Sequence, residues 1–301
     1  MTASLRPWIL AARPKTLGAA IAPVLVGSAL GWRISGEFCV WLALATLASC
    51  MCLQIATNLF NDAVDGMKGS DTKARLGPTR ITASGMMSSK KVLTVATIVL
   101  GAAILFAAPL IWYRGWPIIA IGIPSLWFCY GYTGGPFPLA YRGLGELFVV
   151  LFFGLIAVTG STFVQTGYWH VEAVVAGLQV GMLSTVLIAI NNLRDIAEDT
   201  KTGKRTLAVR FGVRFAKWEI FLLAFLTPFL GFFAWSILGA PWLAIIPGVV
   251  AQPVAWIAVK IWKTPPSPAY NRFLAQTGVW LMMFALSFCA VLYMTRPIPV
   301  P

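Results

Sequence analysis

The chain has 301 residues, of which 58% are hydrophobic and only 11% are charged. A soluble domain usually carries about a quarter of charged residues, so this composition excludes an ordinary water-soluble fold. The net charge of +13 is explained by short basic loops beside an anionic membrane leaflet, and we therefore expect no nucleic-acid partner. Length and apolar content predict one integral-membrane domain over residues 1–301, in contact with membrane lipids.

Apolar runs long enough to cross about 30 Å of hydrocarbon recur along the whole chain. The run at 117–132 is short, and the run at 144–166 contains Glu146. We expect an all-α fold, a polytopic membrane bundle of about nine transmembrane helices that encloses a central active-site cavity. The nine runs lie at about 16–32, 38–57, 92–113, 117–132, 144–166, 171–190, 216–238, 241–260 and 273–295.

The basic residues are distributed asymmetrically between the two sides of the predicted membrane. If the N-terminus is cytoplasmic, all but three of the 23 Lys and Arg residues lie on the cytoplasmic side; the exceptions are Arg33, Arg114 and Arg296. Basic residues near helix ends are retained in the cytoplasm. We therefore expect a protein of the cytoplasmic (inner) membrane whose N-terminus and two polar loops, at about 58–91 and 191–215, face the cytoplasm.

Six of the ten acidic residues lie in two short segments that each follow an apolar run. In both segments, NLFNDAVD and NNLRDIAED, an amide is followed by carboxylates at helical spacing, so a continued helix places them on one face. Because both segments lie at cytoplasmic helix ends, we expect them to share one site. The clusters contain Asn58, Asp62, Asp65 and Asp71, and Asn191, Asp195, Glu198 and Asp199.

Basic residues follow each acidic cluster. Mg²⁺ prefers oxygen ligands and is commonly shared with substrate phosphates, while Lys and Arg neutralise the remaining phosphate oxygens. The pattern therefore predicts a magnesium and phosphate site, and an ordinary solvated loop of mixed charge is the alternative. The basic residues are Lys68, Lys73, Arg75 and Arg80 in the first loop, and Lys201, Lys204 and Arg205 in the second.

Two other functions can use similar residues. A CDP-alcohol phosphotransferase motif would begin like Asp62, Asp65 and Gly66, but Gly69 and Ser70 stand where that motif needs Ala-Arg. A membrane transporter can also carry duplicated polar motifs, but its carboxylates should lie near mid-membrane. There is no Walker-type glycine loop and no HExxH motif.

The chain resembles the UbiA-type intramembrane aromatic prenyltransferases along nearly its whole length. ARPKTLGAAIAPVLVG at 12–27 is similar to the opening helix of that family. NDAVDGMKGSD at 61–71 and NNLRDIAEDTKTGKRTLAVRFG at 191–212 are similar to its two aspartate motifs. The resemblance implies nine spans and a cytoplasmic N-terminus.

Within the family, three stretches most resemble the 1,4-dihydroxy-2-naphthoate polyprenyltransferases of menaquinone synthesis: ARPKTL, RLGPTRITASG at 75–85 and GGPFPLAYRGLGE at 134–146. The resemblance implies Mg²⁺-dependent transfer of a polyprenyl group from polyprenyl diphosphate to 1,4-dihydroxy-2-naphthoate, with loss of CO₂ and diphosphate, to give a demethylmenaquinol. Homogentisate and 4-hydroxybenzoate remain alternative acceptors, and phytyl, as in phylloquinone synthesis, remains an alternative donor group.

The resemblance also implies roles for individual residues. Asp71 follows Asp65 by six residues rather than the family's four, which leaves its role, like that of Glu198, open. We expect the catalytic carboxylates to hold Mg²⁺ with help from two amides, namely Asp62, Asp65, Asp195 and Asp199 with Asn58 and Asn191. The residues expected to bind diphosphate are Lys68, Arg75, Arg80, Lys201 and Arg205. Those expected to face the acceptor or the carbocation are Lys15, Arg142, Tyr130 and Tyr132.

Overall fold

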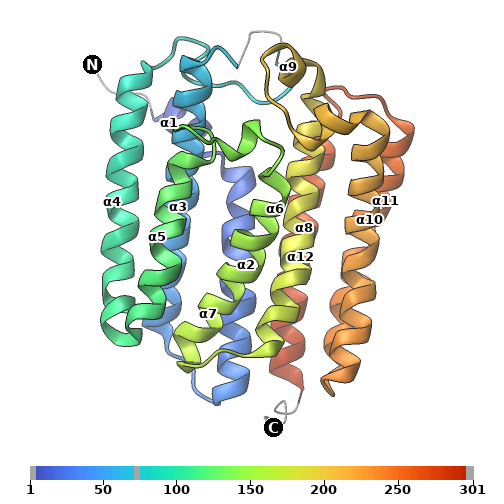
Figure 1. Cartoon of the computed structure of the whole chain (residues 1–301). Coiled ribbons are helices and arrows are strands. Elements are labelled where there is room, and N and C mark those ends of the chain that lie inside the picture. The colour runs from blue at the N-terminus through green and yellow to red at the C-terminus, as the bar shows by residue number, and fades with distance from the viewer. Residues whose placement is uncertain (1–4, 71–74, 296–301) are drawn as a thin grey trace.

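A computed structural model of the chain describes residues 5–70 and 75–295. These residues form helices joined by short connections, with no strand among them, which confirms the all-α prediction (Figure 1). The helices are α1 (Arg6–Ala12), α2 (Pro14–Ser35), α3 (Val40–Met67), α4 (Ser89–Arg114), α5 (Trp116–Gly131), η1 (Leu139–Tyr141), α6 (Gly145–Val149), the π-helix η2 (Val150–Ile156), α7 (Ala157–Thr166), α8 (Val171–Arg194), α9 (Ile196–Lys201), α10 (Leu207–Ile237), α11 (Pro241–Lys263) and α12 (Tyr270–Met294).

Eight helical segments within the described residues are long and apolar enough to span a membrane, and the segment from α6 through α7 counts as one of them. The ninth predicted span corresponds to α5, which has 16 residues and is therefore only about 24 Å long. Its length is limited by Pro117 at its start and by the turn that follows Gly131. The prediction of about nine spans is thus close, and the protein is an integral-membrane protein.

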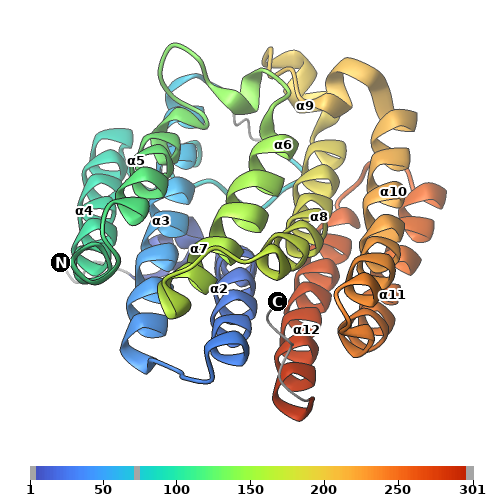
Figure 2. The same ribbon diagram turned by 60° about the horizontal axis from the view of Figure 1, so that its bottom comes forward.

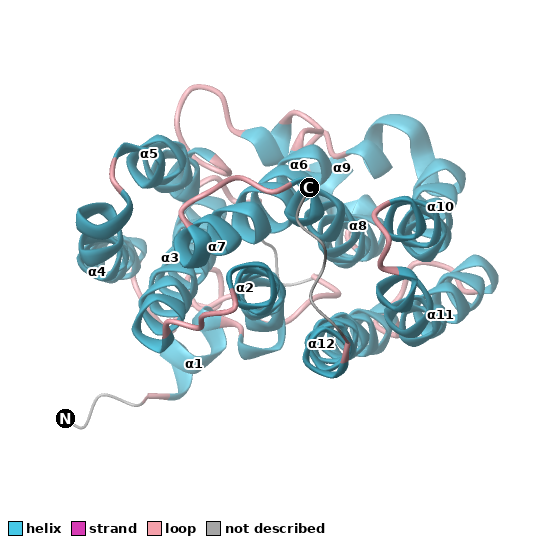
Figure 3. Cartoon of the chain, turned by 90° about the horizontal axis from the view of Figure 1, so that it is seen from below, coloured by secondary structure: helices cyan, strands magenta, loops and turns pink. Residues whose placement is uncertain are grey.

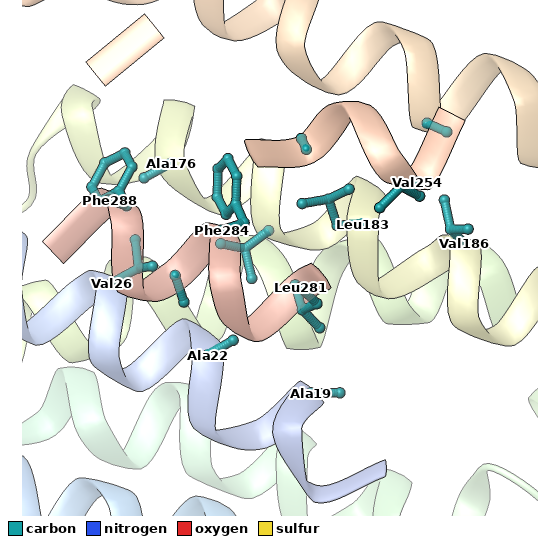
Figure 4. Close-up of a cluster of buried hydrophobic side chains, with 14 of the residues drawn as sticks. Ala19, Ala22, Val26, Ala176, Leu183, Val186, Val254, Leu281, Phe284 and Phe288 are labelled. Carbon is teal, nitrogen blue, oxygen red and sulfur yellow. The ribbon is translucent and has the colours of Figure 1, made fainter. Parts of the chain in front are cut away.

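Helix α2 lies at the centre of the bundle and packs against α3, α7, α8 and α12. Helices α4 and α5 flank it on one side, and α10 and α11 lie beyond α8 and α12 on the other (Figures 2 and 3). Most of the large core is built around α2, α8 and α12, with Val26, Leu183 and Phe284 each fully buried in it (Figure 4). Large apolar side chains such as Trp112 cover the outside, as lipid contact requires.

Glycines set how closely η2 approaches α8 and how closely α2 approaches α7. A side chain on Gly154 would collide with the backbone of Gly177 and Gly181, and one on Gly27 would collide with the Val158 carbonyl. Small residues in such positions let helix backbones meet in a membrane, where packing rather than water exclusion drives association. The wide turn of η2 lies directly beside this contact.

Helices α3 and α8, which carry the two acidic motifs, end at the same end of the bundle (Figure 1). We call this the motif end. Helix α1 and the short helix α9 also lie there, whereas α12 finishes at the opposite end. The antiparallel course of successive helices therefore brings together two motifs that lie 133 residues apart in the sequence, as the sequence indicated.

Candidate active site

A chamber of about 170 Å³ lies at the motif end between α2, α3, α6 and α8. We call it the polar chamber, because amides and charged groups from these helices and from the loops above them line it. Several of the predicted site residues belong to its wall, and others lie around it. The polar lining includes Arg13, Asn58, Asn61, Asp65, Arg80, Tyr132, Glu146, Asn191, Asn192 and Lys204.

Asp62 is directed toward the loop that follows α3. Its two carboxylate oxygens accept hydrogen bonds from the backbone N–H groups of Ile81, at 3.1 Å, and Thr82, at 3.0 Å. The Thr82 hydroxyl donates a third bond, at 2.7 Å. Asp62 is 1% exposed, so this carboxylate holds the loop that carries Arg80 against the end of α3.

Asp65 lines the polar chamber and is surrounded by donors and cations. The Tyr141 hydroxyl donates to its Oδ1 at 2.8 Å. On the other oxygen, the Lys204 Nζ lies at 3.8 Å and the Arg80 Nη2 at 4.0 Å. An acidic group from α3 and a lysine that follows α9 therefore meet here, which brings the two motifs into one site.

Asp195 ends α8 and is held by arginine. Arg194 donates from Nε to Oδ1 at 2.7 Å and from Nη2 to Oδ2 at 2.6 Å, and Arg75 adds a bond to Oδ2 at 3.3 Å. Arg194 is 1% exposed and also donates to the side-chain oxygens of Asn191 and Asn271. This network fixes the end of α8 to the loop after α3 and to the start of α12.

Asp199 lies one helical turn after Asp195, in α9, and is also buried. The pKa of this carboxyl is raised to about 7, mainly by burial and also by the charges of Asp195 and Asp65, while Lys204 and Arg75 oppose the shift. The carboxyl is therefore close to other acidic groups and would be stabilised by an additional cation.

The two predicted amides, Asn58 and Asn191, both line the polar chamber. The Asn58 amide donates to the Ala12 carbonyl at 3.0 Å, where α1 ends. The next residue, Arg13, has a φ of 53°, which is uncommon for a residue other than glycine and turns the chain into α2. Asn58 thus supports the turn that places Arg13 in the chamber.

The predicted diphosphate-binding residues fall into two groups. Arg80 lines the polar chamber and Arg75 pairs with Asp195. Lys201 and Arg205 are exposed, and Lys68 donates to the Thr133 carbonyl at 2.6 Å and lies over the Tyr141 ring. Asp71 and Lys73 lie outside the described residues.

The four residues predicted to face the acceptor or carbocation also divide. Tyr132 lines the polar chamber, whereas Tyr130 packs edge-on against Phe60 and is 44% exposed. Lys15 is exposed, and the Arg142 guanidinium stacks 3.8 Å from the centre of the Phe137 ring. A role for Lys15 or Arg142 in binding the acceptor stays a prediction.

The family model of the UbiA prenyltransferase family matches residues 20–288 of this chain. The chain belongs to this family. The match covers most of the bundle and both acidic motifs of this UbiA prenyltransferase.

Curated relatives match at higher identity than the solved structures. A 1,4-dihydroxy-2-naphthoate octaprenyltransferase from Mycobacterium tuberculosis is 36% identical over 96% of this chain and 98% of its own length. The protein of that name from Bacillus subtilis is 35% identical over 80% of this chain and 78% of its own length. These relatives place the chain among the prenyltransferases.

Solved structures of UbiA homologues have the same fold. One from Archaeoglobus fulgidus, bound to GPP and Mg²⁺, has a TM-score of 0.66 at 16% identity and covers 96% of this chain and all of its own. The apo structure of a homologue from Aeropyrum pernix K1 has a TM-score of 0.69 at 16% identity and covers 89% of this chain and 96% of its own.

A second, apolar chamber of about 240 Å³ adjoins the polar one in this UbiA prenyltransferase. It extends between α3, α4, α5 and α7 and is lined mostly by Ile, Leu, Ala and Phe. Gln54, Thr57, Phe148 and Phe153 line both chambers, so the apolar space begins where the polar chamber ends.

The donor groups fit a shared magnesium ion better than a protein-only metal cage. The part of the chain that the structure describes contains no group of three or more His, Cys, Asp and Glu placed to hold a metal. Mg²⁺ usually keeps several waters and binds one or two carboxylates together with substrate phosphates. Asp65 lines the chamber, and its charge is one cause of the raised pKa of Asp199, so these two carboxylates fit such a shared ion.

Several residues in or beside the chamber were given no role in the predicted site. Asn61 lines the chamber and precedes Asp65 by one helical turn, so the helical spacing already contained that signal. Arg194 lies inside the second motif, between Asn191 and Asp195. Others, such as Tyr141, Lys204 and Glu146, reach the site through tertiary packing, which no local spacing shows.

Proposed function

We propose that this enzyme transfers a polyprenyl group from polyprenyl diphosphate to 1,4-dihydroxy-2-naphthoate, with release of diphosphate and CO₂, to give a demethylmenaquinol. The observation that carries the proposal is the junction of the two chambers, one charged and one apolar. A prenyl diphosphate has the same two-part character, with a charged head and a long hydrocarbon tail.

The diphosphate head would lie among the cations of the polar chamber. Lys204 and Arg80 flank Asp65, and Arg75 lies beside Asp195. We propose that Asp65 and Asp199 face the metal and that Asp62 and Asp195 hold the surrounding loops, with Asn58 and Asn191 at the chamber wall. When bound, Mg²⁺ would neutralise the negative charge that develops on the leaving diphosphate. Lys68, Lys201 and Arg205 would attract the head group from the cytoplasm.

The prenyl tail would extend into the apolar chamber. Breaking the allylic C–O bond leaves positive charge on carbon, and this carbon must be kept from water until the aromatic ring attacks it. Phe148, at the junction of the two chambers, stacks on Phe152 with ring centroids 4.3 Å apart, and Tyr132 packs against Phe148. Aromatic faces at this position would stabilise the cation and exclude water.

The identity of the acceptor is supported by the names of the relatives, which act on 1,4-dihydroxy-2-naphthoate. A third relative, a 2-carboxy-1,4-naphthoquinone phytyltransferase from Synechocystis, is 24% identical over 70% of the chain. The loss of CO₂ is part of the proposal, in which the prenyl group replaces the ring carboxylate.

The experiment is turnover by the purified enzyme in lipid, with Mg²⁺, a polyprenyl diphosphate and a panel of acceptors, followed by mass analysis of the lipid product. We expect a prenylated naphthalenediol that lacks the carboxylate, formed with one CO₂ per turnover. If only 4-hydroxybenzoate or homogentisate gave a product, the proposal that 1,4-dihydroxy-2-naphthoate is the acceptor would be wrong. If phytyl diphosphate were used equally well, the range of donor substrates would include phytyl as well as polyprenyl groups.

We also propose that the motif end faces the cytoplasm at the inner membrane, because the topology predicted from the sequence puts all but three Lys and Arg residues on that side. Lys90 lies at the motif end of α4, and Tyr168 is exposed at the opposite end. In a cysteine-free background, Lys90→Cys should react with an impermeant reagent only after the cytoplasmic side is opened, whereas Tyr168→Cys should react in intact cells. The reverse pattern would invert the topology.

A further inference from the structure

Glu146 is a buried acidic residue of the polar chamber that the diphosphate site does not use. It is 5% exposed and lines the chamber wall. The Asn192 amide donates to its Oε1 at 2.7 Å, and its Oε2 is buried without a hydrogen-bond partner among the residues that the structure describes. A buried carboxylate oxygen without a donor is costly, so this position calls for a donor from a bound molecule.

The surroundings of Glu146 differ from those of the four motif aspartates. Asp65 has Lys204 and Arg80 beside it, and Asp195 has two arginines. Glu146 is held by the neutral amide of Asn192 and takes part in no ion pair among the described residues. Its acceptor capacity is therefore not committed to the cations that would bind diphosphate.

The fold holds Glu146 rigidly at this place. Gly154, eight residues further along, is locked against Gly177 and Gly181 of α8, and the antiparallel course of α8 brings Asn192 back beside Glu146. The intervening segment is the π-helix η2, and π-helical turns are frequent at functional sites because they redirect side chains.

A phenol and a cation lie close by in the same chamber. The Tyr132 hydroxyl approaches Gly145, the residue before Glu146, so closely that a Cβ there would lie 2.8 Å from it. Arg13, held in its unusual backbone turn, lines the chamber as well. An aromatic ring with one carboxylate and free hydroxyl groups would find complementary partners here: a cation, a carboxylate acceptor and an aromatic wall.

We propose that Glu146 accepts a hydrogen bond from a hydroxyl group of the aromatic acceptor and removes its proton when the ring attacks, while Arg13 faces the acceptor's carboxylate. This inference rests on the proposed function and assigns the acceptor end of that same site. Glu146 is then a catalytic residue of the reaction, and Asn192 is a positioning residue that acts through it.

The proposed step moves the prenyl group from oxygen to a ring carbon and one proton to Glu146. The allylic C–O bond breaks and its electron pair leaves with diphosphate. A ring electron pair forms the new C–C bond, the O–H electron pair becomes the C=O bond of a ring ketone, and the proton moves to Glu146. The bond from ring carbon to carboxylate then breaks, CO₂ leaves, and the electron pair restores the aromatic ring as a phenolate. Glu146 returns its proton to that oxygen.

The test combines a side-chain change with a change in the acceptor. Glu146→Gln keeps the size of the side chain and an oxygen for Asn192 but cannot take a proton. We expect its kcat with the dihydroxy acceptor to fall at least about 100-fold, the usual range for a general base, with the KM for prenyl diphosphate within about twofold. The same enzymes are then assayed with the two monomethyl ethers of the acceptor.

One of the two ethers blocks the hydroxyl that would donate to Glu146, and the wild-type enzyme should be slow with it. Glu146→Gln should lower that rate no further, because the carboxylate and this hydroxyl act as a pair. Glu146→Asp should retain part of the activity. Glu172→Gln makes the same change in a buried carboxylate at the opposite end of α8 and should turn over like the wild type.

A residual kcat above about one third for Glu146→Gln, or an equal loss with both ethers and the dihydroxy acceptor, would overturn the inference. If Glu146→Gln fails to bind prenyl diphosphate, Glu146→Asp provides the same comparison. Failure of the proposed function is distinguishable, since the wild-type enzyme itself would then not prenylate the naphthoate.

Discussion

The two acidic motifs have similar sequences but hold their carboxylates in different ways. In each motif one carboxylate is anchored by the protein: Asp62 by the N–H groups and hydroxyl of residues 81–82, and Asp195 by Arg194 and Arg75. The other is not held by such a set of bonds: Asp65 is placed in the chamber among cations, and Asp199 is buried near other acidic groups. Motifs of similar spacing therefore each combine one firmly anchored carboxylate with one that the protein holds by fewer bonds.

The anchoring chemistry also differs between the motifs. Neutral backbone donors hold Asp62, so the first motif is fixed to its own following loop. A buried guanidinium holds Asp195 and extends through Asn271 to the Leu76 carbonyl, so the second motif is fixed to two other parts of the chain. The second motif thus organises the site across the bundle, and the first organises it locally.

The largest loss should follow from changing one of the two less anchored carboxylates, Asp65 or Asp199. Asp65→Asn should lower kcat by about 1,000-fold or more, about 4 kcal/mol of transition-state stabilisation, with little change in thermal stability. Asp199→Asn should behave alike, and the double variant should lose little more than either single one, since both act on one assembly. Turnover in lipid and thermal melting measure these effects. If the losses of the two single variants added up in the double variant, the two carboxylates would not act on one assembly.

A smaller loss, combined with lower stability, should follow from changing the anchored Asp62. Asp62→Asn sets an NH₂ group against backbone N–H donors, so the loop that carries Arg80 should loosen. Changes in such supporting groups typically cost 10–100-fold in activity, and buried unsatisfied donors lower stability by about 1–3 kcal/mol. Thr82→Val removes only the hydroxyl and is the control. A loss equal to that of Asp65→Asn with unchanged melting would make Asp62 a metal ligand.

The other anchor should respond mainly in stability. Arg194→Lys keeps a positive charge but loses the fork that binds both Asp195 oxygens together with Asn191 and Asn271. We expect an activity loss of about tenfold and a destabilisation of about 2–4 kcal/mol, close to that for breaking a buried ion pair. Denaturant or thermal unfolding in detergent checks it. If Arg75→Lys is equally damaging, the anchor depends on Arg75 as much as on Arg194.

The smallest effect should be a pH dependence of magnesium binding. Burial raises the pKa of Asp199 to about 7, so the carboxyl carries a proton for part of the time at neutral pH, and a metal must displace it. The apparent affinity for Mg²⁺ in the presence of prenyl diphosphate should therefore rise between pH 6 and pH 8. Asp199→Asn should flatten that rise. A pH-independent affinity in the wild-type enzyme would place Asp199 away from the metal.

The fold was predictable because each helix that crosses a membrane requires a long apolar run. Most spans lie where the sequence has such runs. The shared position of the motifs was predictable as well, since each follows an even number of crossings. Successive residues of an α-helix are rotated by about 100°, so Asp62 and Asp65 differ by about 60° in direction. The two residues were predicted to lie on one helix face. In the structure, Asp62 is directed to the loop and Asp65 lines the chamber.

Which basic residue enters the site could not be read from local sequence. Lys201, Lys204 and Arg205 lie within five residues, and Gly203 between them has a φ of 75°. This left-handed turn reverses the chain, so Lys204 faces Asp65 while its two neighbours remain exposed. Glu146 was missed for a related reason, because its partner Asn192 comes from a helix 46 residues away.

The apolar chamber has a wall that also faces outward. Ile104, Ile119 and Ile123 line it and are 49%, 41% and 63% exposed on α4 and α5, a surface that contacts lipid in a membrane protein. A prenyl donor that enters from the bilayer is dissolved in two dimensions, and its concentration is set by its mole fraction among the lipids. Diluting the bilayer with inert lipid should therefore slow the enzyme at constant total donor, whereas diluting the whole suspension with buffer should not.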